Sequence, residues 1–328
     1  MIGTYRIRKK IERRIFSRSG WMARSLRGNI PYLEAWRRPI IDISRSHGLG
    51  DVLLSTPALR EIKRLNPKSH IRFYTKYPSL LRGLPYINEV FSMEHCPKNA
   101  IRLLCEDSLP STFHISQLMG DCLGVNVTNI MPDCVVNHEM VKLYRARWGR
   151  EFTIVVSLES SGFAPNKNWP IEYWDELIQR ISKKFHVILI GNKTENDMFS
   201  SKMVTDMRGK TSLEDLIAIV ASGNFYVGPM TGPYHIAAAT GCPSLVILGG
   251  YESPNNACYP GSIVLSSNLP CSPCWLSDNC PHSKLCLTSI SVDLVENKII
   301  NFFLTKGNPT SEVSASRMSR DNSKLHSY

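Results

Sequence analysis

Short apolar runs alternate with helical segments through residues 152–248. Four runs are predicted to be strands, at 152–158, 186–190, 225–227 and 243–248, and three helical segments separate them, at 171–184, 211–222 and 233–240. Alternating strands and helices are typical of a parallel sheet with helices on both faces. This half of the chain is therefore predicted to be a doubly wound α/β domain.

The first half begins with the same pattern. A short buried strand at 38–45 leads into a glycine turn, and apolar residues at helical spacing follow from Val52 to Leu65. Further strands are expected at 70–75 and after 85, and an irregular α/β region at 96–136. We expect two facing domains, at 39–150 and 151–305, with a basic arm at 1–38 and a disordered Ser-rich tail at 306–328.

The positive charge is concentrated at the ends of the chain. Of the formal net charge of +11, residues 1–38 contribute +9 and residues 306–328 contribute +2, so the body at 39–305 is neutral. A nucleic-acid-binding domain is expected to spread its positive charge over a folded face. The body is therefore not predicted to bind nucleic acid.

The basic arm has two interpretations. Ile7, Ile11 and Ile15 are four residues apart among Lys and Arg, so a helix there would have an apolar stripe and a cationic back, which suits an anionic membrane surface. Alternatively, it is a solvated arm whose isoleucines pack on the body. No apolar run approaches the ~20 residues that span a membrane, and no signal-peptide region follows the arginines. We expect a cytoplasmic protein, peripheral on the inner membrane face if the arm binds lipid.

The turn Gly48-Leu49-Gly50-Asp51 places a carboxylate at the start of the first helix. The third glycine of a dinucleotide fingerprint would fall at Leu53, which argues against a NAD site. Asp51 is then either a helix cap or a general base, and the turn alone favours the cap.

Two stretches in the second half suit a phosphate ligand. Thr231-Gly232-Pro233-Tyr234-His235 begins a helix, whose first N–H groups can bind a diphosphate. Lys167, after the first strand of this half, can add a point charge. Taken singly, the first is a tight connector with His235 as a buried hydrogen-bonding residue, and the second is a surface lysine.

Together these stretches resemble glycosyltransferase family 9, whose best-known members are ADP-heptose:lipopolysaccharide heptosyltransferases. The resemblance rests on 48–59 and on Lys167-Asn168-Trp169-Pro170, Gly209-Lys210-Thr211-Ser212-Leu213 and Thr231–Ala239, and it covers about 39–303. It implies the GT-B fold, two facing Rossmann-like domains, with the acceptor on the first and a nucleotide sugar, ADP-linked in the best-known members, on the second.

The resemblance also implies roles for individual residues. Asp51 corresponds to the general base on an acceptor loop that includes Gly48 and Gly50. The donor diphosphate would be bound by Lys167, Ser160, Ser161, Thr231, Gly232 and His235, and Glu195 would bind the ribose. No metal is expected for catalysis, because lysine, a helix dipole and backbone donors can stabilise the leaving diphosphate.

Met230 departs from the family pattern. Members commonly have aspartate there, against the donor sugar, and methionine cannot accept strong hydrogen bonds from hydroxyl groups. The resemblance therefore predicts an inverting glycosyltransferase acting on a lipopolysaccharide-type or other surface glycan, with heptose as the candidate sugar. The alternative is a catalytically silent GT-B protein that binds a nucleotide or glycan as a partner.

Four cysteines are clustered as C-x2-C-x5-C-x5-C, namely Cys271, Cys274, Cys280 and Cys286. In a reduced compartment this spacing suits a structural zinc or iron ion, and His282 can replace one ligand. Exposed thiols beside the cleft are the alternative, and two disulfides are expected only outside the cytoplasm.

Overall fold

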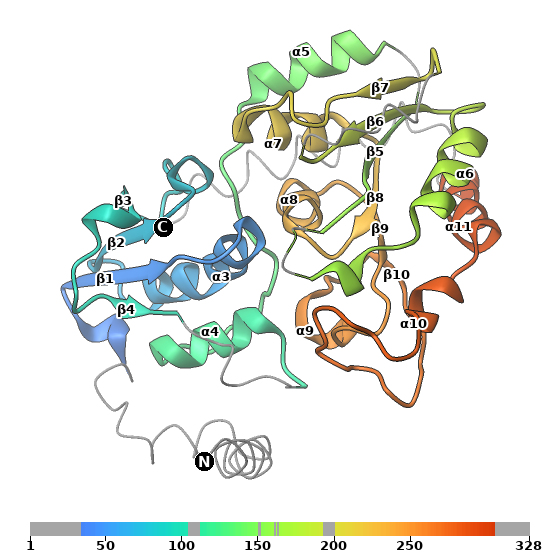
Figure 1. The fold of residues 1–328 in the computed structure, drawn as a ribbon. Helices are drawn as coiled ribbons and strands as arrows, with labels where there is room; N and C mark the ends of the chain where they lie inside the picture. The colour runs from blue at the N-terminus through green and yellow to red at the C-terminus, as the bar shows by residue number, and fades with distance from the viewer. Residues whose placement is uncertain are drawn as a thin grey trace.

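The computed structural model describes residues 34–103, 112–149, 152–160, 162, 164–192 and 201–305 (Figure 1). Its first sheet is parallel, in the order β3-β2-β1-β4. The strands are β1 (Ile40–Arg45), β2 (His70–Thr75), β3 (Glu89–Ser92) and β4 (Ile101–Arg102). The basic arm up to residue 33, the tail from 306, Ser161 and Glu195 lie outside the described residues, so the predictions made for them stay predictions.

The second sheet is also parallel, in the order β10-β9-β8-β5-β6-β7. Its strands are β5 (Thr153–Ser157), β6 (His186–Ile190), β7 (Val204–Asp206), β8 (Phe225–Pro229), β9 (Ser244–Ile247) and β10 (Ile263–Leu265). This is the strand order of a dinucleotide-binding sheet, in which ligands bind at the carboxyl ends of the two strands where the order reverses. Here those strands are β5 and β8.

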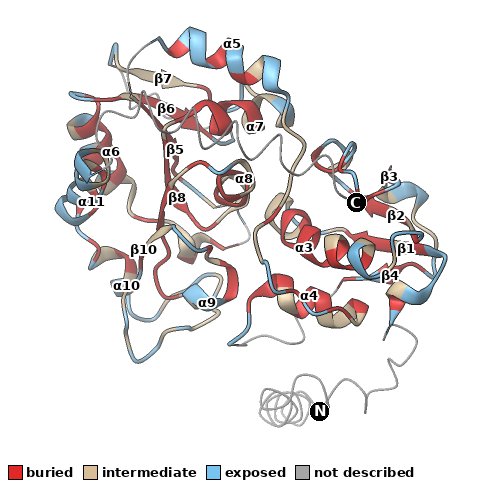
Figure 2. Ribbon diagram, turned by 180° about the vertical axis from the view of Figure 1, so that it is seen from behind, coloured by how far each residue is buried: buried red, intermediate tan, exposed pale blue. Residues whose placement is uncertain are grey.

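Helices cover both sheets, and Figure 2 shows buried residues along the strands and along α3 and α8 between the two halves. The helices are α3 (Leu49–Leu65), α4 (Ile115–Leu123), α5 (His138–Trp148), α6 (Ile171–Ile181), α7 (Leu213–Ser222), α8 (Gly232–Thr240), α9 (Pro254–Ala257), α10 (Leu285–Thr288) and α11 (Val292–Thr305). Short 3-10 helices include η3 (Pro78–Leu80), η4 (Met93–His95) and η6 (Pro165–Lys167). Among the described residues, no helix is long and apolar enough to cross a membrane.

The predicted α/β architecture is confirmed, and the strands and helices expected in 152–248 are present. The pattern missed β4, β7 and β10, which have only two or three residues. Such short strands leave no measurable alternation in the sequence.

Helix α5 packs against α7 of the second half (Figure 1). The Tyr144 hydroxyl donates to Asp215 Oδ1 at 2.7 Å, and the Trp148 indole N–H donates to Ser222 Oγ at 3.1 Å. The connection from α4 to α5 therefore carries the chain from one sheet to the other.

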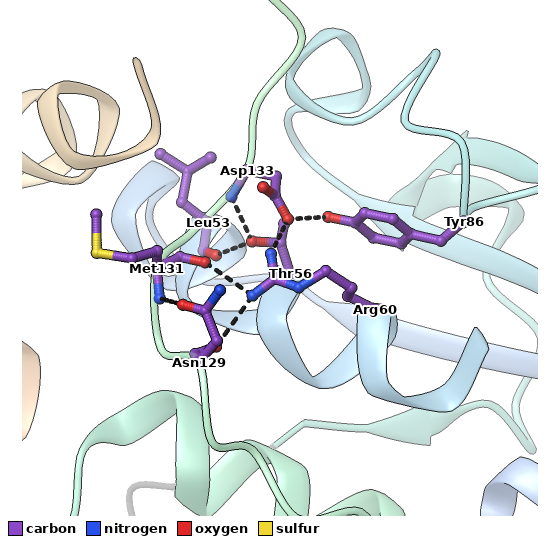
Figure 3. A network of polar contacts seen from close by, with 7 residues as sticks. All are labelled: Leu53, Thr56, Arg60, Tyr86, Asn129, Met131 and Asp133. Carbon is purple, nitrogen blue, oxygen red and sulfur yellow. Dashed lines mark hydrogen bonds and ion pairs between the residues drawn. The ribbon is translucent and has the colours of Figure 1, made fainter. Parts of the chain in front are cut away.

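That connection is fixed to the middle of α3, as Figure 3 shows. Asp133 forms an ion pair with Arg60 of α3 and accepts a hydrogen bond from the Tyr86 hydroxyl at 2.7 Å. The Asp133 N–H donates to Thr56 Oγ1 at 2.9 Å, and Thr56 donates to the Leu53 carbonyl at 2.7 Å. Proline at position 57 has no N–H for that carbonyl, so the Thr56 hydroxyl replaces the missing donor.

Candidate active site

Asp51 lies in the first turn of α3, where its carboxylate is held from two sides. The Gly48 N–H donates to Oδ2 at 3.1 Å, and Arg45 Nη2 donates to Oδ1 at 2.7 Å. The Gly48 contact confirms that Asp51 caps the start of α3. However, the Asp51 side chain is 36% exposed, so its carboxylate also reaches solvent.

Arg45 is a site residue that the sequence reasoning missed. It ends β1, its side chain is 1% exposed, and its Nη1 also donates to the carbonyl of Leu103, just after β4. A buried guanidinium needs such partners, because burying an unpaired charge is very costly. The signal in the sequence was a basic residue at the end of an apolar strand, six positions before Asp51.

The first turn of α8 is the part of the second half that corresponds to the Asp51 turn at the start of α3. Thr231 is the N-cap residue, and Gly232 and Pro233 begin the helix, as predicted. The backbone N–H groups of a helix start favour an anionic ligand. Met230, just before it, is only 2% exposed and packs in the core, so the side chain that follows β8 offers no strong hydrogen-bonding group to the site.

The starts of α3 and α8 contact each other directly. An ideal Cβ on Gly50 would lie 2.5 Å from Cδ2 of His235, and one on Gly232 would lie 2.7 Å from Cδ2 of Leu49. A Cβ on Gly50 would force the buried His235 ring to move, so this glycine is required for the approach, whereas at Gly232 the end of the Leu49 side chain would have to shift. The predicted acceptor loop and the predicted diphosphate site are thereby brought together.

His235 lies inside this contact as a neutral residue. Its ring is 4% exposed, its Nδ1 is 2.7 Å from the Tyr259 hydroxyl, and burial lowers its pKa to about 3. The ring of His114, from the first half, also packs against Tyr259, and burial lowers the pKa of His114 to about 4. At neutral pH neither imidazole adds charge, so the structure gives His235 a packing role between the helices.

Lys167, in η6, is paired with a carboxylate. Its ammonium forms an ion pair with Glu252, and the two side chains are 15% and 7% exposed. The ammonium also lies 5.2 Å from the centroid of the Tyr251 ring, and its charge contributes to lowering the pKa of His235. Lys167 therefore faces the α8 region rather than open solvent. Sequence reasoning missed Glu252, because nothing in its neighbourhood marks it.

The loop at 271–286 supports both members of this pair. The backbone N–H and the side-chain amide of Asn166 donate to Ser277 and Leu276 carbonyls at 3.0 and 2.8 Å. On the other side, the Cys274 N–H donates to the Gly250 carbonyl and the Trp275 N–H to the Tyr251 carbonyl, both at 2.9 Å. This loop therefore positions η6 and the segment that contains Glu252.

The four clustered cysteines are free thiols on that loop. Burial and the three neighbouring thiols raise the pKa of Cys286, whose sulfur accepts a hydrogen bond from the Gly250 backbone. Within the ranges given above, no group of three or more His, Cys, Asp or Glu side chains is arranged to hold a metal ion. The predicted metal site is thus not assembled in this arrangement.

Ser160 stabilises the loop after β5. Its backbone N–H and its hydroxyl both contact Asn168 Oδ1 at 2.7 Å, and the hydroxyl also lies 2.9 Å from the Ala164 carbonyl. The contact of Ser160 with a phosphate stays a prediction. Ser161 and Glu195 lie outside the described residues.

A cavity of about 390 Å³ opens at the carboxyl ends of β1 and β4, next to Arg45. Among the described residues, its lining includes three cationic side chains and a histidine but no carboxylate: Ser44, Arg45, Ser46, His47, Met93, Cys96, Pro97, Lys98, Arg102 and Leu103. Such a lining favours an anionic ligand.

Comparison with known proteins supports a common origin. Residues 114–283 match the model of glycosyltransferase family 9 (heptosyltransferase). Lipopolysaccharide heptosyltransferase 1 of Pseudomonas aeruginosa is 27% identical over 124 residues, which are 35% of this chain and 34% of that protein. The chain thus aligns with about a third of the length of this curated relative.

Two solved structures share the fold. ADP-heptose lipopolysaccharide heptosyltransferase II of Escherichia coli superimposes with a TM-score of 0.62 at 15% identity, covering 81% of this chain and 99% of that one. The iron-containing dodecameric glycosyltransferase TibC of enterotoxigenic E. coli gives 0.62 at 19% identity, covering 80% and 75%. These likenesses confirm the GT-B-like arrangement. Because the family model matches more than half of the chain, the chain belongs to glycosyltransferase family 9.

Proposed function

We propose that the protein is an inverting glycosyltransferase that transfers a sugar from a nucleoside diphosphate to an anionic glycan acceptor. The observation that carries this proposal is the position of Asp51. Its partly exposed carboxylate lies at the start of α3, which contacts the start of α8 through Gly50 and His235. Direct displacement of the diphosphate by an acceptor hydroxyl needs a base for the hydroxyl proton and a site that binds the leaving anion. The proposed base belongs to the first half and the proposed anion site to the second.

The second half, 151–305, is proposed to bind the donor. The first N–H groups of α8 and the Lys167 ammonium would stabilise the diphosphate, with Ser160, Ser161 and Glu195 as further contacts. ADP-heptose is the favoured donor, because a solved relative is described as an ADP-heptose heptosyltransferase.

In the proposed reaction, Asp51 accepts the proton of an acceptor hydroxyl. The hydroxyl oxygen forms a bond to the anomeric carbon, and the bond from that carbon to the diphosphate oxygen breaks on the opposite side, with inversion. The leaving electron pair stays on the diphosphate, where Lys167 and the α8 dipole stabilise it. Arg45 fixes the orientation of the base.

The first half, 39–150, is proposed to bind the acceptor in the cavity beside Arg45. The cations Lys98 and Arg102 suit the phosphate or carboxylate groups of a lipopolysaccharide-type glycan. A lipid-linked acceptor would also suit the basic arm at 1–38 as a contact with an anionic membrane surface.

We also propose that Cys271, Cys274, Cys280 and Cys286 bind a structural zinc or iron ion after a local rearrangement of their loop. Four thiolates are the ligand set of such sites, and the relative TibC is described as iron-containing. The ion would hold the loop that positions η6 and Glu252, and it would take no part in the transfer.

A catalytically silent nucleotide-binding protein is the second candidate, because Met230 is apolar and buried where β8 meets α8. Thermal unfolding with ADP-, GDP- and UDP-linked sugars, followed by assay of nucleoside diphosphate release, separates the two. We expect an ADP-linked sugar at about a hundred times its Kd to add ~2.7 kcal/mol of stability and to be turned over with an anionic acceptor. Binding without turnover supports the silent protein, and no binding contradicts both.

A further inference from the structure

We propose that Glu252 is the carboxylate that recognises the sugar of the donor, and that it selects a neutral, hydroxyl-rich sugar. This inference deepens the proposed transfer reaction and rests on it. It arises from the pairing of Glu252 with Lys167, the lysine proposed to bind the diphosphate.

Glu252 is placed at the ligand-binding edge of the second sheet. It follows β9, which pairs in parallel with β8, so the segment containing Glu252 and the start of α8 leave neighbouring strands at the same edge. The side chain is 7% exposed. A carboxylate buried to this degree is costly unless it is paired, and here its ion-pair partner comes from the loop after β5.

Its carboxylate keeps spare hydrogen-bonding capacity. Oε1 is buried and forms the ion pair with the Lys167 ammonium, and no other donor contacts it within the described part of the chain. An ionised carboxylate can accept about four hydrogen bonds. Sugar hydroxyls are donors of the kind that would complete this set, whereas Met230 at the end of β8 can accept none of comparable strength.

The surrounding contacts hold Glu252 in place for such a role. The hydrogen bonds from Cys274 to Gly250 and from Trp275 to Tyr251 fix the two residues before it. Lys167, the lysine proposed to bind the diphosphate, is therefore paired with a carboxylate whose segment is held in place. A bound donor would share the ammonium with Glu252, and a sugar that carries its own carboxylate would be repelled.

The test compares ADP with ADP-heptose by isothermal titration calorimetry on the full chain. Wild type is expected to bind ADP-heptose more tightly than ADP. Glu252→Gln is expected to bind ADP about tenfold more tightly, since a negative charge beside the diphosphate is removed, and to lose the advantage of ADP-heptose. Glu252→Asp should keep part of that advantage.

The matched control is Asp42→Asn. Asp42 is a carboxylate paired with Arg72 on the first sheet, with a side chain 16% exposed, and its substitution should leave both affinities unchanged. Glu252→Gln could instead shift the ADP and ADP-heptose affinities equally, or shift neither. Either result would show that the ion pair is purely structural, and it would overturn this inference but not the proposed function. A wild type that binds neither compound would overturn the proposed function together with it.

Discussion

The guanidinium of Arg45 donates to Asp51 Oδ1 at 2.7 Å from a position that is 1% exposed, while Asp51 itself reaches solvent. The proposed base is thus connected to the end of β1, and through the Leu103 carbonyl to the segment after β4. Its orientation is set by the sheet and does not depend on the substrate.

Arg45→Met should therefore misplace Asp51. We expect a loss of turnover of up to about a hundredfold and a loss of about 1–3 kcal/mol in the free energy of unfolding, since the Leu103 carbonyl loses its partner. Arg45→Lys restores the charge and should recover part of the turnover. Steady-state kinetics at several pH values and urea unfolding measure both. An Arg45→Met variant with normal turnover would show that this pairing does not orient the base.

Gly50→Ala should force the starts of α3 and α8 apart, because its Cβ would meet the His235 ring at 2.5 Å. Overpacking of this kind costs about 1–3 kcal/mol, and turnover should fall with it. Gly162→Ala is the control, since no atom of the described residues is found within 4 Å of a Cβ there. Thermal unfolding and turnover of the two variants should differ clearly. Equal behaviour would mean that the contact between the helices is not required.

Stability should fall in mild acid because two histidines are buried in the neutral form. Burial lowers the pKa of His114 to about 4 and of His235 to about 3, from 6.5. The unfolded chain therefore binds more protons between these values and pH 6.5, so this stabilisation is complete above pH 6.5 and is lost as the pH falls. At pH 5 each histidine should cost about 2 kcal/mol.

Urea unfolding at pH 7 and pH 5 measures this effect. His114→Asn retains an acceptor for the Ser116 N–H, which His114 now caps, and it should flatten the pH dependence. If the free energy of unfolding of this variant depends on pH as strongly as that of the wild type, His114 is excluded as a source of the acid sensitivity.

Substitutions in the cavity proposed to bind the acceptor should change the KM for the acceptor without changing nucleotide binding. Lys98→Ala and Arg102→Ala remove cations from its lining, so the KM for an anionic acceptor should rise about tenfold for each. The Kd for the nucleotide should not change. Because both residues are exposed, added salt should weaken the wild-type interaction as well. A KM that is insensitive to both substitutions and to salt would place the acceptor elsewhere.

If the four clustered cysteines bind a metal ion, removing the ion should weaken binding of the donor nucleotide. Native mass spectrometry of the reduced protein should show one zinc or iron ion per chain. Chelation should then expose four alkylatable thiols and weaken ADP binding, because the loop positions η6 through Asn166. Four thiols that react at once in a metal-free protein would contradict the proposed ion.

Local patterns in the sequence predicted the two α/β halves and the turns that contain Asp51, Lys167 and Thr231, because strands, turns and helix starts depend on neighbouring residues. The partners of these residues could not be predicted. Glu252 reaches Lys167 across 85 positions, and His235 reaches Gly50 from the other half of the chain. The first contact depends on the order of the strands in the second sheet, and the second depends on how the two halves meet, and no local pattern encodes either. The buried position of Met230 has the same origin.

The most direct test of the account is the turnover of Asp51→Asn, measured together with its nucleotide affinity. If Asp51 is the general base, turnover should fall by about 10²–10⁴-fold, while the Kd for ADP stays at the wild-type value, since Lys167 and α8 bind the diphosphate. Asn at this position can still accept the Gly48 N–H, so the helix start should be retained. Turnover near the wild-type rate, with folding and nucleotide binding intact, would contradict the central claim.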